Sequence, residues 1–465
     1  MKREREDSSS GSMLIQRVRK KKVLRERNRW VADVIGSTET LLDSGFILRA
    51  SRKPRRTFRG GSLCAVCKGS RLLCGKPRCP LILRLSKYLE NSPRIRKNEL
   101  YGNSPPGVFI GRVGYPYVFA GPLVPPLTED TSLYDTPELW FGKSMEEIVG
   151  FRSLLVRGKH LVNVKKPERG GRILEKTREL ALSVRSIDVE VDFKDKPRKQ
   201  IILDDNVQPF GPSATILKMK IGNPKWDWRI EKAYYDIDLR ASEAVLDLYY
   251  NNVLVSRIQK AFSVGAFGVE KARRLVPTRW SITAVDSIIS KDLIRRVKRY
   301  PEINEFRVYE STYLDNRFEI LMIPAKWSYE AMEAWYPGTI WNPTGKTIAI
   351  LSDWEGYDGR TTYADIGGCY YSARLAVLEK LNEERRQATV VVLREARPGY
   401  IMPVGVWQVR ENVRNAMRKT PLKFNTLKEA LSWMGTRFYI PIEKWIQESQ
   451  ILRRSLYQRT LMNFL

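Results

Sequence analysis

Alternation of apolar and polar residues marks the clearest strand of the chain. Between residues 186 and 193, four apolar residues alternate with three acidic ones. The apolar ones are Ile187, Val189, Val191 and Phe193, and the acidic ones are Asp188, Glu190 and Asp192. This period of two predicts a strand with one buried face. Further strands are expected at 347–351 and 389–393.

Apolar residues at helical spacing predict a set of helices. The longest is expected at 239–263, and others at 172–184, 290–300, 371–386, 409–417, 426–433 and about 442–456. Between 101 and 126, closely spaced Gly, Pro and aromatic residues predict loops and short strands. Since helices and strands interleave without a regular repeat, we expect an α+β fold, with a mixed α/β fold as the alternative.

Composition divides the chain into five expected regions. They are a flexible basic arm (1–30), a basic segment with clustered cysteines (31–100), an N-terminal core domain (101–310), a C-terminal domain (311–440) and a C-terminal helix with a tail (441–465). No long apolar run predicts a membrane-spanning helix, and the N-terminus lacks the apolar stretch of a secretory signal. We therefore expect a cytoplasmic protein without a membrane partner.

The net charge of the chain indicates which class of partner it binds. The chain has 81 Lys and Arg against 52 Asp and Glu, a formal net charge of +29. Residues 1–100 hold 26 basic and 9 acidic side chains, so this part alone carries +17. Such an excess attracts polyanions, and nucleic acid is the commonest of them. A merely solubilising surface is the alternative.

Four of the five cysteines lie within sixteen residues. Cys64, Cys67, Cys74 and Cys79 follow a Cys-x2-Cys-x6-Cys-x4-Cys pattern, which suits a closed tetrahedral zinc site with a structural role. Four thiolates can also hold an iron–sulfur cluster. A disulfide framework does not suit a large intracellular chain.

Few residues offer catalytic chemistry. His160 is the only histidine, which leaves little for a Ser-His-Asp or multi-histidine site, and no phosphate-binding loop appears. The acidic strand 186–193, followed by Asp204 and Asp205, could hold magnesium or be a solvated face. The candidate catalytic residues are Arg112, Tyr115, Arg279 and Asp286. An Arg beside a Trp, as at Arg279, can stack on a base and meet a phosphate, or its charge can be satisfied inside the core by Asp286.

The last eight residues resemble the box that binds the sliding clamp (proliferating cell nuclear antigen). The matching residues are Gln458, Leu461, Phe464 and Leu465. In one helical turn the three apolar side chains project to the same side, because they are i, i+3 and i+4 neighbours. The alternative is a frayed end of the preceding helix that packs on its own protein.

Several segments resemble the archaeal Nre family of DNA-repair proteins. They are 111–116, 121–123, 180–183, 188–191, 211–214, 275–286, 385–388, 394–398 and 403–407, and the string Thr-Arg-Trp-Ser-Ile-Thr-Ala-Val-Asp at 278–286 is the most specific. The resemblance implies an archaeal source, a role in recovery from DNA damage, an N-terminal zinc motif and a C-terminal clamp-binding motif. It implies no catalytic residues.

The sequence thus favours a DNA-repair factor that binds DNA and is recruited by the sliding clamp. An enzyme acting on damaged DNA or a nucleotide-derived adduct is one alternative, and a non-catalytic adaptor for RNA or protein is another. A deep pocket where segments 111–116 and 278–286 converge, faced by an arginine and a carboxylate, would favour the enzyme. A basic surface without such a pocket would favour the binding factor.

Overall fold

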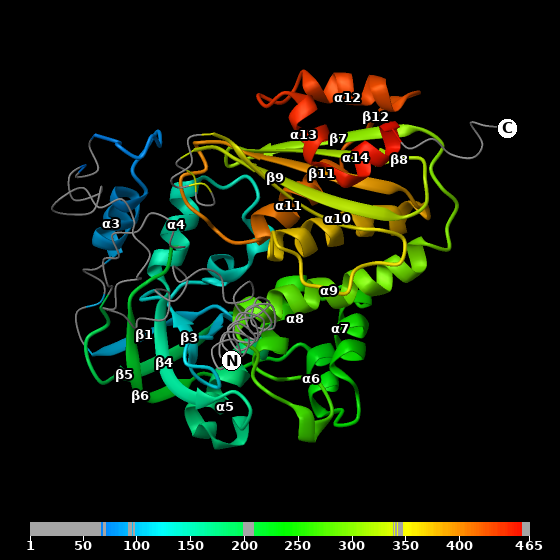
Figure 1. Cartoon of the computed structure of the whole chain (residues 1–465). Coiled ribbons are helices and arrows are strands. Elements are labelled where there is room, and N and C mark those ends of the chain that lie inside the picture. Colours follow the sequence, from blue (N-terminus) through cyan, green and yellow to red (C-terminus); the bar gives the residue numbers. More distant parts are fainter. Residues whose placement is uncertain are drawn as a thin grey trace, which may run out of the picture.

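Two mixed six-stranded sheets, one from each half of the chain, form the frame of the protein (Figure 1). They are seen in a computed structural model, which describes residues 67, 71–91, 95, 98–198, 209–337, 339, 342 and 347–457. The arm 1–30, Cys64, Asp204, Asp205 and the tail 458–465 lie outside the described residues.

Sheet 1 belongs to the N-terminal half. Its strands are β1 (Glu99–Ser104), β2 (Val108–Ile110), β3 (Tyr117–Val124), β4 (Val156–Asn163), β5 (Ile187–Phe193) and β6 (Ser213–Ile221), in the order β1-β5-β6-β4-β3-β2. The β4–β6 pair is parallel and the other pairs are antiparallel. Along β5 the apolar residues are buried and the acidic ones more exposed, which confirms the predicted half-buried strand.

Sheet 2 belongs to the C-terminal half. Its strands are β7 (Phe306–Tyr313), β8 (Asn316–Ile323), β9 (Ser328–Trp335), β10 (Ala349–Glu355), β11 (Thr389–Ala396) and β12 (Leu422–Phe424), in the order β10-β9-β11-β8-β7-β12. β9 and β11 run parallel. β11 is buried along its whole length, because helices cover both faces of this sheet. The strands predicted at 347–351 and 389–393 correspond to β10 and β11.

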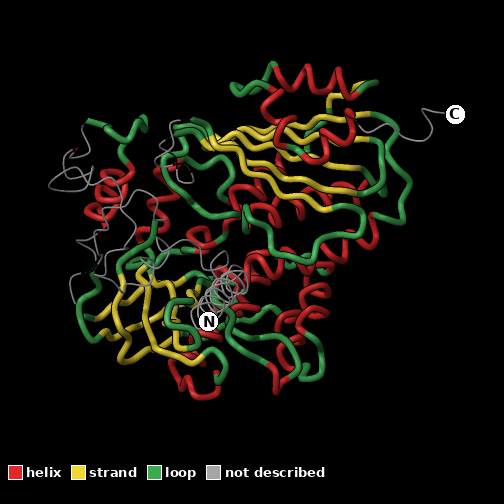
Figure 2. The backbone as a smooth tube through the Cα atoms, viewed as in Figure 1, coloured by secondary structure: helices red, strands yellow, loops and turns green. Residues whose placement is uncertain are grey.

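Helices fill the space between the sheets and cover the outer face of sheet 2 (Figure 2). The helices of the described residues are α3 (Pro80–Asn91), α4 (Met145–Leu154), α5 (Gly171–Leu182), α6 (Trp228–Tyr235), α7 (Ala241–Tyr250), α8 (Val255–Ser263), α9 (Thr278–Val297), α10 (Gly368–Glu384), α11 (Trp407–Met417), α12 (Leu427–Gly435), α13 (Ile442–Glu448) and α14 (Gln450–Tyr457). One apolar cluster runs from Val118 on sheet 1 through Val285 of α9 to Val390 on sheet 2. The two sheets therefore share a core.

Three predicted helices are wrong in extent. The helix expected at 290–300 is the second half of α9, which begins at Thr278. The helix expected at 239–263 is split into α7 and α8 by a turn at Asn251 and Asn252, where Asn252 has φ of 60°, a left-handed conformation that Asn tolerates. The helix expected at 442–456 is also two, α13 and α14. The buried carboxylate of Glu330 on β9 accepts the backbone N–H groups of Gln450 and Ile451, both at 2.9 Å, and so starts a new helix there.

The α+β fold class is confirmed, with sheets and helices mixed along the whole described chain. Among the described residues, no helix combines the length and apolar character needed to cross a membrane.

Candidate nucleic-acid interface

The β2–β3 loop and the first turn of α9 meet. The backbone N–H of Ile110 donates to Thr278 Oγ1 at 2.9 Å. The ring of Tyr115 lies against that of Trp280, with centroids 5.3 Å apart and planes tilted by 44°. The loop that carries Arg112 and Tyr115 is thus joined to the helix that carries Arg279.

Backbone hydrogen bonds hold this loop in one shape. Tyr117 N–H donates to the carbonyl of Gly114 at 2.9 Å, and Val164 N–H donates to that of Pro116 at 2.9 Å. Gly114 has φ of +81°, and a Cβ there would lie 2.7 Å from the carbonyl oxygen of Tyr117, so the turn requires glycine. The Tyr115–Pro116 peptide bond is cis. The Tyr115 ring is therefore positioned by the chain itself.

The three segments that meet at this ring pair are rich in basic residues. Segments 109–119, 157–166 and 278–285 contain six Lys or Arg and no Asp or Glu. The six are Arg112, Arg157, Lys159, Lys165, Lys166 and Arg279. Lys165 Nζ lies 5.9 Å from the centroid of Tyr115, and Lys159 Nζ lies 5.8 Å from that of Phe119. Lys165, Lys166 and Arg279 are exposed, whereas Arg112 and Arg157 are buried. We call the surface formed by these three segments, with its exposed cations and aromatic rings, the aromatic–basic surface.

A hollow of about 340 Å³, counting space open to solvent, lies on this surface. It is lined by Phe109, Gly111, Val113, Phe119, Arg157, Gly158 and Lys159. The Arg157 guanidinium lies 4.9 Å from the ring centroid of Phe109 and 4.1 Å from that of Phe210. None of these lining residues is acidic. The lining of the hollow contains cations and rings but no carboxylate for acid–base chemistry.

Asp286 faces away from this surface, into the helical core. Its side chain is 0% exposed. Arg410 Nη1 donates to both carboxylate oxygens at 2.7 and 2.9 Å, and Gln259 and Ser372 add bonds of 2.9 and 3.0 Å. Burial raises the pKa of Asp286, while the Arg410 guanidinium opposes that shift. Asp286 thus joins α9 to α8, α10 and α11, and its partner in the core is Arg410.

Comparison with known proteins settles the family. The model of the archaeal Nre N-terminal region matches residues 73–342, and that of the archaeal Nre C-terminal region matches residues 355–464. The chain belongs to the archaeal Nre family. The resemblance seen in the sequence is thereby confirmed.

Three relatives of this Nre protein are named as DNA-repair proteins. DNA repair protein NreB of Archaeoglobus fulgidus is 43% identical over 403 residues, which cover 86% of this chain and 100% of the relative. DNA repair protein NreA of the same organism is 38% identical, covering 80% of this chain and 93% of its own. NreA of Haloferax volcanii is 34% identical, covering 75% and 84%. No solved structure matches this Nre chain.

The acidic strand of this Nre protein is matched by basic residues across the sheet. Lys220 on β6 bonds to both carboxylate oxygens of Glu190 at 3.1 and 3.2 Å, and Lys218 lies opposite Asp192. Among the residues that the structure describes, no three His, Cys, Asp or Glu side chains are grouped to hold a metal ion. The described part of the strand is therefore a solvated face with cross-strand pairs.

Three of the four clustered cysteines are described, and none of them forms a disulfide. Cys67 is buried, and its Sγ accepts the backbone N–H of Leu73 at 3.4 Å. Because Cys64 lies outside the described residues, the zinc site stays a prediction.

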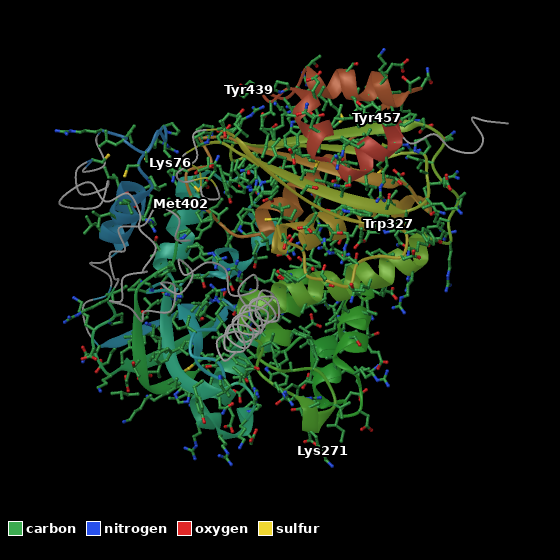
Figure 3. All side chains as sticks on the ribbon, viewed as in Figure 1. Lys76, Lys271, Trp327, Met402, Tyr439 and Tyr457 are labelled. Atoms are coloured by element: carbon green, nitrogen blue, oxygen red, sulfur yellow. The ribbon has the colours of Figure 1, made fainter. Side chains whose placement is uncertain are left out.

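The C-terminal helices of this Nre protein are fixed to sheet 2 by two buried glutamates that the sequence analysis missed. Glu330 holds the start of α14, and Glu395 on β11 accepts the N–H groups of Tyr439 and Ile440 at 3.1 and 3.0 Å. Tyr457, labelled in Figure 3, ends α14. The candidate clamp-binding residues Gln458, Leu461, Phe464 and Leu465 follow this anchored helix directly and lie outside the described residues.

Lys159 on β4 and Lys165, which follows β4, were not predicted from the sequence. The available signal was four basic residues and no acidic one between 157 and 166. It was overlooked because β4 has no clean alternation of apolar and polar residues.

Proposed function

We propose that this protein is a DNA-repair factor that binds DNA through the aromatic–basic surface and is recruited by the sliding clamp through its tail. The carrying observation is the convergence of three segments with six basic and no acidic residues around exposed aromatic rings. Phosphate attracts such a surface, and aromatic rings add contacts to bases. The names of the three relatives support the role in repair.

Binding is favoured over catalysis by the lining of the hollow. The enzyme alternative required an arginine and a carboxylate that face one pocket. The hollow offers Arg157 and Lys159 without a carboxylate, and Asp286 is buried against Arg410 instead. A surface of this composition can hold DNA but has no evident proton donor and acceptor pair.

Clamp recruitment rests on the box at 458–465 and on its position. α14 is anchored by Glu330, so the tail begins at a fixed point of the protein. The match to the family's C-terminal region extends to residue 464 and so includes most of the box. The zinc proposal rests on the four-cysteine spacing.

A direct test uses the full chain and a fluorescent DNA duplex. The triple variant Lys165→Gln, Lys166→Gln, Arg279→Gln, at three exposed positions of this surface, should weaken DNA binding at least about tenfold, because each lost phosphate contact removes counterion release. The control Lys218→Gln, Lys220→Gln, Lys232→Gln removes the same charge elsewhere and should change affinity much less. Equal losses in both triple variants would contradict this DNA-binding surface. Incubation of the same proteins with damaged DNA, followed by analysis of the products, tests the enzyme alternative.

A further inference from the structure

Resting on the proposed function, we propose that the Tyr115–Trp280 ring pair stacks on an unpaired DNA base. The aromatic–basic surface would then be specialised for single-stranded DNA or for a position where a duplex has opened. This names both the chemical class of the ligand and the residues that select it.

The rings are presented outward from a fixed loop. Tyr115 is 44% exposed and Tyr117 is 58% exposed, which is much for aromatic side chains. One side of the Tyr115 ring rests against Trp280, and the loop is held by the Gly114, Pro116 and Thr278 bonds. Because the ring is already in place, little conformational entropy is lost when a flat ligand stacks on it.

Only an unpaired base can use such a ring well. In a duplex each base is covered on both faces by its neighbours, so a protein ring can stack only on a base that has left the stack. Stacking on an aromatic side chain tolerates any base, because every base has a π-face. The ring pair therefore favours an open strand and carries no sequence preference.

The basic residues lie where the strand's phosphates are needed. Lys165 lies beside the ring of Tyr115, and Lys159 on β4 lies beside the ring of Phe119 on β3. A strand whose base stacks on Tyr115 would keep its phosphates close to these ammonium groups. Aromatic rings within a positive groove are the usual means of binding single strands.

The same sheet supplies a matched control. Tyr101 on β1 is 56% exposed, and it pairs with Glu190 on the acidic strand β5. Its ring is as accessible as that of Tyr115, but its cross-strand partner is a carboxylate. Comparison of Tyr101 with Tyr115 therefore distinguishes the effect of an exposed ring alone from the effect of a ring beside basic residues.

The experiment compares Tyr115→Ala and Tyr101→Ala in the full chain. The probes are one sequence as single-stranded DNA, as duplex and as single-stranded RNA, plus a single strand with one 2-aminopurine. Tyr115→Ala should weaken single-strand binding roughly tenfold or more, because one base stack is lost. Duplex affinity should change less than about twofold, and Tyr101→Ala should change neither. Quenching of 2-aminopurine fluorescence by the unaltered protein, lost in Tyr115→Ala, would report the stack itself.

The outcomes separate this inference from the proposed function. Binding to DNA with no effect of Tyr115→Ala, or with an equal loss on single strand and duplex, overturns the stacking site and leaves the DNA-binding role standing. Tighter binding of RNA than of DNA overturns the ligand class. Absence of any DNA binding overturns both. Unchanged thermal unfolding of Tyr115→Ala excludes misfolding as the cause of a loss.

Discussion

At the scale of single residues, several carboxylates of the C-terminal half are buried. Glu319 on β8 is buried, and its Oε1 accepts two bonds from Arg317 at 2.9 and 2.6 Å, while Oε2 has no hydrogen-bond partner in the described structure. Burial raises the pKa of Glu319 to about 7, although Arg317 opposes the shift. This carboxyl therefore changes charge in the neutral range.

The raised pKa of Glu319 predicts a pH-dependent stability. A carboxyl with a folded pKa above its ordinary value stabilises the folded protein when protonated, so this contribution is present at low pH and is lost as pH rises through about 7. Glu319→Gln stays uncharged. Relative to that of the unaltered protein, its free energy of unfolding should increase from pH 5 to pH 8, so that the variant becomes the relatively more stable of the two.

Urea denaturation at four pH values measures this difference. Comparison with the unaltered protein cancels the other titrating groups. Glu190→Gln, an exposed carboxylate paired with Lys220, is the control and should give a curve parallel to that of the unaltered protein. A Glu319→Gln difference that is the same at every pH would refute the assignment.

The cysteine cluster gives a second prediction at this scale. We expect one zinc per chain, bound by Cys64, Cys67, Cys74 and Cys79. Cys64→Ser should lower the zinc content and destabilise the N-terminal region, because structural zinc binding contributes to folding free energy. Cys369→Ser, outside the cluster, should keep its zinc. Elemental analysis that finds no metal, or iron with visible absorption, would reject the site.

At the scale of elements, the sequence predicts best where one face is buried. β5 and α5 were identified because their apolar residues repeat with a period of two or about 3.6. β9 and β11 are covered on both faces, so β9 showed no alternation and was missed, and β11 was found only as an apolar run. The hollow could not be predicted from the sequence either, because its lining residues Phe109, Phe119 and Arg157 come from separate strands.

Anchoring of α14 by Glu330 is a prediction about an element. In Glu330→Gln the side chain loses its charge and one acceptor oxygen, so the bonds to Gln450 and Ile451 weaken. Hydrogen exchange should become faster at 449–452 and stay unchanged in α9. Glu443→Gln, an exposed residue of the first turn of α13, is the control. Unaltered exchange in Glu330→Gln would show that apolar packing alone holds α14.

The tail gives the second prediction at this scale. Leu461, Phe464 and Leu465 should insert together into an apolar pocket of the clamp, with the Gln458 amide beside them. Phe464→Ala should cost at least about 2 kcal/mol of binding free energy, roughly 30-fold in affinity. A peptide of residues 450–465 should bind the clamp alone, and Met462→Ala should bind nearly as well as the unaltered peptide.

Removal of residues 458–465 from the full chain completes that test. Clamp binding should be abolished and DNA affinity unchanged. Calorimetry with the clamp and anisotropy with DNA measure the two separately. Full clamp binding by the truncated protein would refute the assignment of the box.

At the scale of the whole molecule, the two proposed contacts lie on different parts of one packed body. The aromatic–basic surface belongs to sheet 1 and the start of α9, while α12–α14 cover the outer face of sheet 2 (Figure 1). The shared core between the sheets keeps these regions in a fixed relation. In the proposed function, DNA and the clamp would therefore engage different parts of one packed body.

The charge of the whole chain predicts how DNA binding responds to salt. If about five phosphates are contacted, the logarithm of the binding constant should fall with the logarithm of salt concentration at a slope of about −4 to −5. Residues 1–30 hold 11 basic and 4 acidic side chains, a net +7, so their deletion should weaken binding and make the slope shallower. The deletion should leave unfolding unchanged, because such a charged arm contributes charge but little apolar core. Titration of a DNA duplex at several salt concentrations measures both proteins. An affinity that is flat from low to moderate salt would show that charge does not drive the binding.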